Sequence, residues 1–202
     1  KWSTGEETQN IRVNQPGSYT VTIQNNFGCE IVKTVIVNAS NNPTIEEIII
    51  NDISDNNTVT INLTDSSIGN YSYSLDAPSG PYQLSNHFQN VEPGEHTVYV
   101  YDNNGCGIAS EKIRVLRIPK FFSPNGDGHN ETWNILGLET SDFANTKISI
   151  FDRYGKLVYS SNGKPNGWDG NLNGTPLLAT DYWYRIILNT GREIKGHFSL
   201  IR

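Results

Sequence analysis

Two stretches of the chain share one short pattern, in which a strand-like run of residues leads into a turn rich in asparagine and glycine. They are Gly17–Cys29 and Gly94–Cys106, and they lie 77 residues apart. In the first copy Tyr19, Val21 and Ile23 alternate with polar residues, as in a strand with one buried face. Asparagine and glycine tolerate the positive φ of a tight hairpin turn. The repeat therefore predicts one antiparallel hairpin in each of two tandem modules, since solenoid units are shorter.

Composition favours strands along the rest of the chain. The 202 residues include 18 glycines and nine prolines, and Val, Ile, Thr, Tyr and Asn are prominent. The repeated hairpin resembles the closing hairpin of immunoglobulin-like repeats in bacterial surface adhesins. We therefore predict an all-β protein of tandem immunoglobulin-like β-sandwiches with a C-terminal β-sandwich. The second module should contain these strands: Thr58–Leu63, Tyr71–Leu75, Tyr82–Leu84, Thr97–Tyr101 and Lys112–Leu116.

The predicted domains are a partial immunoglobulin-like repeat over 1–40, a full repeat over 41–117 and a C-terminal domain over 118–202. The polar segment Asn38–Pro43 predicts the first linker. An incomplete first repeat would leave apolar edge strands exposed. Methionine is absent and no signal peptide or membrane-spanning apolar run occurs. We therefore expect a C-terminal fragment of a longer exported protein, monomeric when isolated.

Charge is distributed unevenly along the chain. Residues 1–117 carry six Lys/Arg against thirteen Asp/Glu, whereas residues 118–202 carry nine against eight. An acidic front half argues against nucleic-acid binding, which requires clustered cations along a phosphate path. The acidity fits a protein that stays dissolved outside the cell.

Each repeat copy ends in one cysteine, Cys29 or Cys106. Exported proteins usually pair their cysteines. Equivalent positions in successive modules lie about a domain length apart, however, and a disulfide needs Cα atoms within about 7 Å. We expect two free, buried thiols, while a Cys29–Cys106 disulfide or a partner upstream of residue 1 stays open. Without histidine at ligand spacing, two cysteines do not form a zinc site.

The C-terminal block has strand patterns of its own. Lys147–Asp152 and Lys156–Ser160 predict one hairpin, and Tyr182–Leu188 with Ile194–Ile201 predicts another. Each buried tryptophan covers on the order of 200 Å² of apolar surface. We therefore expect a β-sandwich whose core contains all three tryptophans of the block: Trp133, Trp168 and Trp183.

Five motifs follow one another in this block: Ile118–Trp133, Ile150–Lys156, Gly167–Gly170, Asp181–Tyr184 and Gly196–Arg202. In this order they resemble the gliding-motility-associated C-terminal domain, the type B sorting domain of the type IX secretion system of Bacteroidetes. The resemblance implies a secretion signal that directs an exported, extracellular cell-surface protein, such as a large motility adhesin. It further implies outer-membrane type IX partners, including a PorP/SprF-like protein.

We expect the last strand to supply much of the partner-recognition surface. Its residues are Gly196, His197, Phe198, Ser199, Leu200, Ile201 and Arg202. Deleting this strand should abolish both folding and export.

The loop Ser123–Glu131 resembles a calcium-binding loop, with oxygen donors at Ser123, Asn125, Asp127 and Glu131. If the loop is compared with an EF-hand, Ser123 takes its first position and Asn134 its twelfth, and neither residue has a carboxylate. An asparagine- and aspartate-stabilised turn explains the same residues. We expect the turn and no cofactor, with calcium as the alternative.

Catalysis has little support in the sequence. No nucleophile-elbow motif occurs, and the four histidines lack metal-ligand spacing: His87, His96, His129 and His197. His129 and Glu131 could exchange protons, but no third group accompanies them. We therefore expect no enzyme.

The alternative function is an adhesive or structural stalk that binds surface polysaccharide. Sugars stack on flat rings, and four aromatic residues could form such a face: Trp2, Tyr71, Tyr73 and Tyr82. Core packing and cross-strand pairing explain the same residues more simply.

Overall fold

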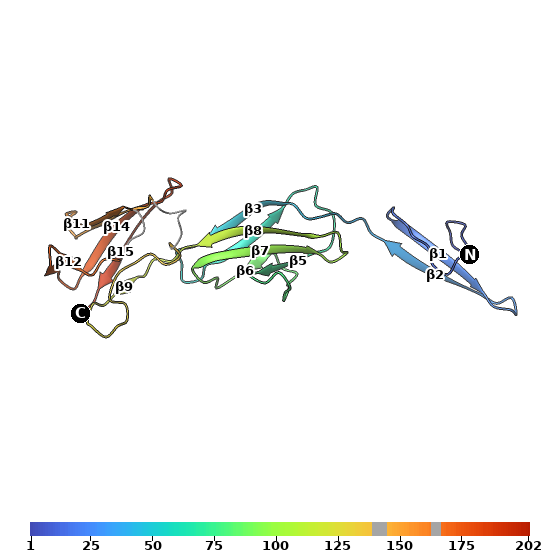
Figure 1. Cartoon of the computed structure of the whole chain (residues 1–202), viewed down its shortest axis with the longest axis horizontal. Helices are drawn as coiled ribbons and strands as arrows, with labels where there is room; N and C mark the ends of the chain where they lie inside the picture. The colour runs from blue at the N-terminus through green and yellow to red at the C-terminus, as the bar shows by residue number, and fades with distance from the viewer. Residues whose placement is uncertain (139–144, 163–166) are drawn as a thin grey trace. The chain divides into compact units, whose positions relative to one another are not determined.

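The chain folds into strands, turns and loops in a computed structural model that describes residues 1–138, 145–162 and 167–202 (Figure 1). Within these ranges no helix is long and apolar enough to cross a membrane. The strands form several sheets in a sandwich-like arrangement. The predicted all-β class is confirmed.

Two compact units make up the chain. The first comprises Lys1–Ile48, Ile61–Asn86 and Val98–Glu111. The second comprises Ile49–Thr60, His87–Thr97 and Lys112–Arg202. Because both units take residues from 41–117, this division tests none of the predicted domain boundaries, which stay predictions.

The first repeat copy forms the predicted hairpin, β1 (Gly17–Gln24) with β2 (Glu30–Val37). Asn25 organises its turn. The Asn25 side-chain oxygen accepts hydrogen bonds from the backbone N–H groups of Phe27 and Cys29, at 2.9 and 3.0 Å. An asparagine that bonds backbone two residues ahead is a common way to stabilise a turn.

The second copy forms the equivalent hairpin around Asp102. The Asp102 carboxylate accepts a hydrogen bond from the Cys106 N–H at 3.0 Å, and the Gly105 N–H donates to the Asp102 carbonyl at 2.9 Å. Cys29 and Cys106 are free and exposed. The prediction of buried thiols is therefore wrong, because each cysteine follows directly on an exposed turn.

Residues 45–115 contribute two three-stranded sheets, ordered β3-β4-β6 and β5-β7-β8. The predicted strands at 58–63 and 71–75 have the observed bounds. The predicted strand at 82–84 is wrong: Gln83 alone forms a bridge, with Tyr73, before the chain turns away to pair Asn86 with Ile61. The strand bounds are β3 (Ile45–Asn51), β4 (Thr58–Leu63), β5 (Tyr71–Leu75), β6 (His87–Phe88), β7 (Gly94–Asp102) and β8 (Ile108–Val115).

Equivalent positions of the two hairpins differ in burial. Ile36 of β2 is 70% exposed, whereas Ile113, 77 residues later in β8, is 8% exposed. Val98 and Val100 of β7 are fully buried, whereas Ile23 of β1 is exposed. The predicted buried face therefore forms in the second copy and not in the first. A sheet face is buried by a second layer and not by neighbours in its own sheet. Residues 45–115 form two three-stranded sheets, so β5-β7-β8 has a second sheet available to cover it, whereas β1 and β2 form a separate sheet of two strands.

The C-terminal block forms a five-stranded sheet in the order β11-β10-β14-β15-β9. Both predicted hairpins occur, as β10 with β11 and β14 with β15. Strand β9 joins in parallel, with Phe121 opposite Ser199. The bounds are β9 (Phe121–Phe122), β10 (Lys147–Phe151), β11 (Leu157–Asn162), β14 (Asp181–Ile187) and β15 (Glu193–Leu200), with a small hairpin of β12 (Asn171–Leu172) and β13 (Thr175–Pro176).

Aromatic rings fill the core behind this sheet. Trp133 stacks on Phe198 with ring centroids 4.2 Å apart, and Trp168 meets Tyr182 edge-on at 5.0 Å. Each indole N–H donates to a backbone carbonyl at 3.0 Å, that of Pro119 for Trp133 and that of Asn171 for Trp168. Burying these two rings therefore leaves no indole donor unsatisfied. The core placement of Trp133 and Trp168 is confirmed.

Candidate functional site

The predicted recognition segment, Gly196–Arg202, divides between the core and the surface. Successive side chains of a strand point to opposite faces. Phe198 and Leu200 therefore lie buried in the core, while His197 is exposed and Ser199 is partly exposed on the other face. Two of the predicted contacts, Phe198 and Leu200, are thus unavailable to a partner while the domain is folded.

The end of the chain is held by several hydrogen bonds. The Ser199 hydroxyl donates to the Asp181 carboxylate at 2.6 Å. The Ile201 N–H donates to the Phe122 carbonyl at 2.9 Å. The exposed Arg202 guanidinium donates to the Gly170 carbonyl at 3.3 Å. Whether this segment recognises a partner stays a prediction.

An aromatic row crosses the outer face of the five-stranded sheet. Phe151, Trp183 and His197 are direct neighbours in register on β10, β14 and β15. The Trp183 and His197 ring centroids lie 6.5 Å apart. Trp183 is 43% exposed, so the expectation that all three tryptophans are core residues is wrong. Because Tyr182 and Tyr184 take the buried positions of β14, alternation places Trp183 outside.

A shallow hollow of about 470 Å³ adjoins this row. Arg185 and Lys195 contribute cations to its wall. Both side chains contact Glu193, and their hydrogen bonds, that of Arg185 first, hold the pKa of Glu193 below its usual value. The outer face therefore combines exposed rings with a charged border.

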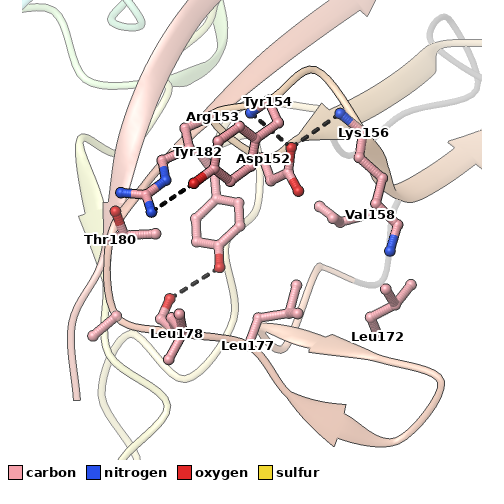
Figure 2. Close-up of a pocket in the computed structure, with 11 residues that line it drawn as sticks. Asp152, Arg153, Tyr154, Lys156, Val158, Leu172, Leu177, Leu178, Thr180 and Tyr182 are labelled. Atoms are coloured by element: carbon pink, nitrogen blue, oxygen red, sulfur yellow. Dashed lines mark hydrogen bonds between the residues drawn. The ribbon is translucent and has the colours of Figure 1, made fainter.

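A second concavity, of about 350 Å³, lies where two of the sequence motifs meet (Figure 2). One side is the turn after β10, and the other is the segment that leads into β14. Sequence reasoning missed the leucines of this segment, although two consecutive leucines between turn residues are a detectable signal. The lining residues are Asp152, Arg153, Tyr154, Lys156, Val158, Leu172, Leu177, Leu178, Ala179, Thr180 and Tyr182.

Internal hydrogen bonds fix both sides of this pocket. The Asp152 carboxylate accepts from the N–H groups of Tyr154 and Lys156 at 2.9 and 3.0 Å. The Tyr182 hydroxyl donates to the Leu178 carbonyl at 2.9 Å. Burial, with a smaller effect of the Asp152 charge, raises the pKa of Tyr182. These bonds fix the turn on one side of the pocket and the backbone at Leu178 on the other.

The calcium-like loop uses its oxygen atoms internally. The Asp127 carboxylate accepts from the Asn125 side-chain amide at 2.9 Å and from the His129 N–H at 2.8 Å, and these bonds, that of Asn125 first, lower the pKa of Asp127. Glu131 accepts from the Gly128 N–H at 3.0 Å. The arrangement has the hydrogen bonds of an aspartate-stabilised turn. Among the described residues, no group of three or more His, Cys, Asp or Glu side chains could hold a metal ion.

The other residues considered for binding are dispersed. His87 shares a hydrogen bond of 2.8 Å with the Thr60 hydroxyl, and His96 one of 2.7 Å with the Glu92 carbonyl. Tyr73, one of the rings proposed to stack on sugars, is buried. The four aromatic residues of that proposal therefore do not form one exposed face.

Comparison with known families identifies the C-terminal block. Residues 116–200 match the CHU_C Type IX secretion signal domain. The resemblance of this block to a type IX sorting domain is thereby confirmed. No curated protein matches the chain.

Several solved structures share a distant likeness with the chain. One is PorZ, a surface component of the type IX secretion system of Porphyromonas gingivalis, with 13% identity, a TM-score of 0.34 and coverage of 95% of this chain and 30% of that one. Another is the BSP domain of a biofilm-associated protein, with 11% identity, a TM-score of 0.28 and coverage of 77% and 29%. The chain thus spans less than a third of either structure.

Proposed function

We propose that residues 118–202 act as a C-terminal secretion signal, a folded domain that directs the attached protein through the type IX secretion system. The observation that carries this proposal is the family match over residues 116–200. The domain's own aromatic core supports it, because a signal recognised in folded form needs a defined surface.

The outer face of the five-stranded sheet contributes one recognition surface in this proposal. Trp183 and His197 are accessible there, and the buried Phe198 holds β15 in place behind them. Aromatic side chains are enriched among residues that dominate binding energy at interfaces. Partner recognition was expected of the whole segment Gly196–Arg202. In this proposal it is carried by the outward side chains of β15 and by their neighbours on β14.

The remaining parts of the proposal concern the partner and the cargo. A PorP/SprF-like outer-membrane protein receives the domain, and the exported protein ends on the cell surface of a gliding bacterium. The modules before residue 118 act as adhesin-like repeats that space or attach the protein. Their hairpin patterns and the acidic composition of residues 1–117 support this assignment.

A reporter fusion tests the signal. Residues 116–202, joined to a fluorescent protein with an export signal, should reach the surface of a host that has the type IX system. Surface protease accessibility measures the result. The full chain of 202 residues serves as the second fusion, so that any need for upstream residues is included. Retention of both fusions in the periplasm would refute the proposal.

Substitutions on the outer face test the recognition surface. The double variant Trp183→Ala/His197→Ala should lower surface display at least about tenfold, since loss of an interface aromatic commonly costs more than about 1 kcal/mol. Phe27→Ala, which removes a highly exposed ring from the first hairpin, is the matched control. Equal display of both variants would exclude the outer face.

A further inference from the structure

The pocket beside the Asp152–Lys156 turn is an apolar hollow with a cationic rim (Figure 2). Val158, Leu172 and Leu177 supply apolar side chains to its lining. Its volume of about 350 Å³ lies at the lower end of the range for ligand pockets, about 300–1,000 Å³. Such a hollow suits a single apolar side chain better than a large cofactor.

The rim places aromatic and cationic groups around this hollow. The Arg153 guanidinium lies 4.9 Å from the centroid of the Tyr154 ring and donates to the Tyr154 hydroxyl at 2.9 Å. Lys156 lines the pocket too and is exposed. The planar guanidinium of an arginine can donate two parallel hydrogen bonds to a carboxylate. Asp152 adds one carboxylate to the lining, and this group already accepts two backbone hydrogen bonds. Two cations against one carboxylate leave the rim with a net positive charge, which is complementary to an acidic group.

The surroundings of the pocket favour a peptide as the occupant. Strand β11, which begins at Leu157 next to the pocket, is at the end of the strand order of the five-stranded sheet. Extended peptides add to sheet edges and place alternate side chains in pockets. Leu178 and Tyr154 in the pocket lining are 79% and 80% exposed, and Leu157 at the start of β11 is 50% exposed. Several exposed apolar side chains gathered beside a hollow are typical of a docking surface, whereas a single one is not.

We propose that this pocket binds an extended peptide segment of the outer-membrane secretion partner, with an apolar side chain in the hollow and a neighbouring carboxylate on Arg153. The identity of the partner rests on the proposed function, whereas the peptide chemistry follows from the pocket. The fixed turn and the Tyr182–Leu178 hydrogen bond preorganise the site, which lowers the entropic cost of binding.

Peptide titration of the full chain tests the chemistry. The probe is the capped hexapeptide glycine-serine-leucine-aspartate-serine-glycine, followed by methyl NMR. Saturable shifts should fall on Val158, Leu172 and Leu177. Replacing the peptide's aspartate by asparagine, or Arg153→Gln in the protein, should weaken binding at least about threefold. Replacing the peptide's leucine by serine should abolish the shifts.

Two variants separate the pocket from the rest of the surface. Leu178→Asp should weaken peptide binding at least about tenfold, because it places a like charge beside the peptide carboxylate and removes apolar contact. Leu84→Asp is the control, since Leu84 is an equally exposed leucine (76%) elsewhere in the chain. Absence of saturable shifts, shifts at other residues, or equal effects of the two variants would overturn the proposal.

The export assay then connects the pocket to secretion. Leu178→Asp and Arg153→Glu should reduce surface display of the full-chain fusion, whereas Leu84→Asp should not. Normal display of both pocket variants would overturn the assignment of the occupant to the secretion partner. If the unaltered fusion is not displayed, the proposed function fails, and the NMR titration alone decides the peptide site.

Discussion

Tyr184 lies across Gly196 on the neighbouring strand of the C-terminal sheet. The two residues are directly opposed in the register of β14 and β15. A Cβ atom at position 196 would lie 2.6 Å from Cζ and 2.9 Å from Cε1 of the Tyr184 ring. The same ring packs against Trp133, with centroids 5.3 Å apart. Glycine at 196 therefore leaves the space in which an aromatic core residue sits.

Gly196→Ala should destabilise the C-terminal domain by about 1–3 kcal/mol, the usual cost of overpacking a core. Urea unfolding followed by tryptophan fluorescence measures this change. Lys195→Ala, at an exposed position of the same strand, is the control and should stay within about 0.5 kcal/mol. The double variant Gly196→Ala/Tyr184→Leu should lose less free energy of unfolding than the two single variants together, because the ring that clashes with the alanine methyl group is absent. Strict additivity would contradict this explanation.

The tryptophans of the C-terminal domain form a matched pair for a second test. Trp168→Ala should cost about 3–5 kcal/mol, since it leaves a large cavity among Tyr182, Phe198 and Phe122. Trp183→Ala should cost less than about 1 kcal/mol, because this ring lies on the outer face. Thermal unfolding of both variants compares them directly. A larger loss for Trp183→Ala would show that the outer face is packed.

Stability should fall in acid partly through Asp102. Burial opposes ionisation of this carboxyl group, but hydrogen bonds from the Ser40 hydroxyl and from the N–H groups of Cys106 and Asn104 prevail and lower its pKa to about 2. Because the folded pKa lies below the unfolded value of about 3.9, the contribution is complete above about pH 4 and disappears as the pH falls towards 2.

This expectation is checked by measuring unfolding midpoints from pH 5 to pH 2, in steps of about half a pH unit around the pKa of the unfolded chain. Asp102→Asn should flatten the profile in that window while lowering stability at neutral pH. An unchanged slope would assign the acid sensitivity to other carboxylates.

Calcium should leave the thermal stability of the protein unchanged. The Asp127 and Glu131 oxygens already accept backbone hydrogen bonds in their turn. At about 5 mM calcium, above the dissociation constants of about 10⁻⁴–10⁻³ M for extracellular modules, the melting temperature should equal that in a chelator. Asp127→Asn serves as the comparison. A rise with calcium in the wild type alone would establish a metal site.

Both cysteines should react with a thiol reagent in the folded protein. Cys29 and Cys106 are exposed and free, and accessible thiols are modified without unfolding. Titration with a chromogenic disulfide under native conditions should consume two equivalents, as the chain has two cysteines. Variants with one serine replacement should consume one each. Reaction only after addition of urea would contradict the exposed positions.

Local features were predictable because they depend on residues close in sequence. The hairpin turn at Asp152 is one case: its carboxylate bonds to N–H groups two and four residues ahead. The strands at 58–63 and 71–75 are another, since alternation and bounding turn residues define their length. The strand predicted at 82–84 does not form, because a single bridge grows into a strand only where neighbouring residues also find pairing partners. The composition of the segment itself does not show this.

The candidate sites were less predictable. The last strand was recognisable, but its division into buried Phe198 and exposed His197 requires knowing which face of β15 meets the core. The pocket between Arg153 and Leu178 was not predicted, because it forms where a turn after one strand meets the approach to another. The loop around Asp127 was predictable as a turn, since its hydrogen bonds are local.

The sequence by itself determined the all-β class, the repeated hairpin and the ordered motifs of the C-terminal domain, because strand alternation and turn chemistry act over a few residues. The tertiary structure decided which aromatic rings are buried, which cysteines are accessible and where a pocket opens. Those outcomes depend on contacts between segments far apart in the chain. Ile36 and Ile113 illustrate this difference: the same repeat position is exposed in a sheet of two strands and buried where further strands pack.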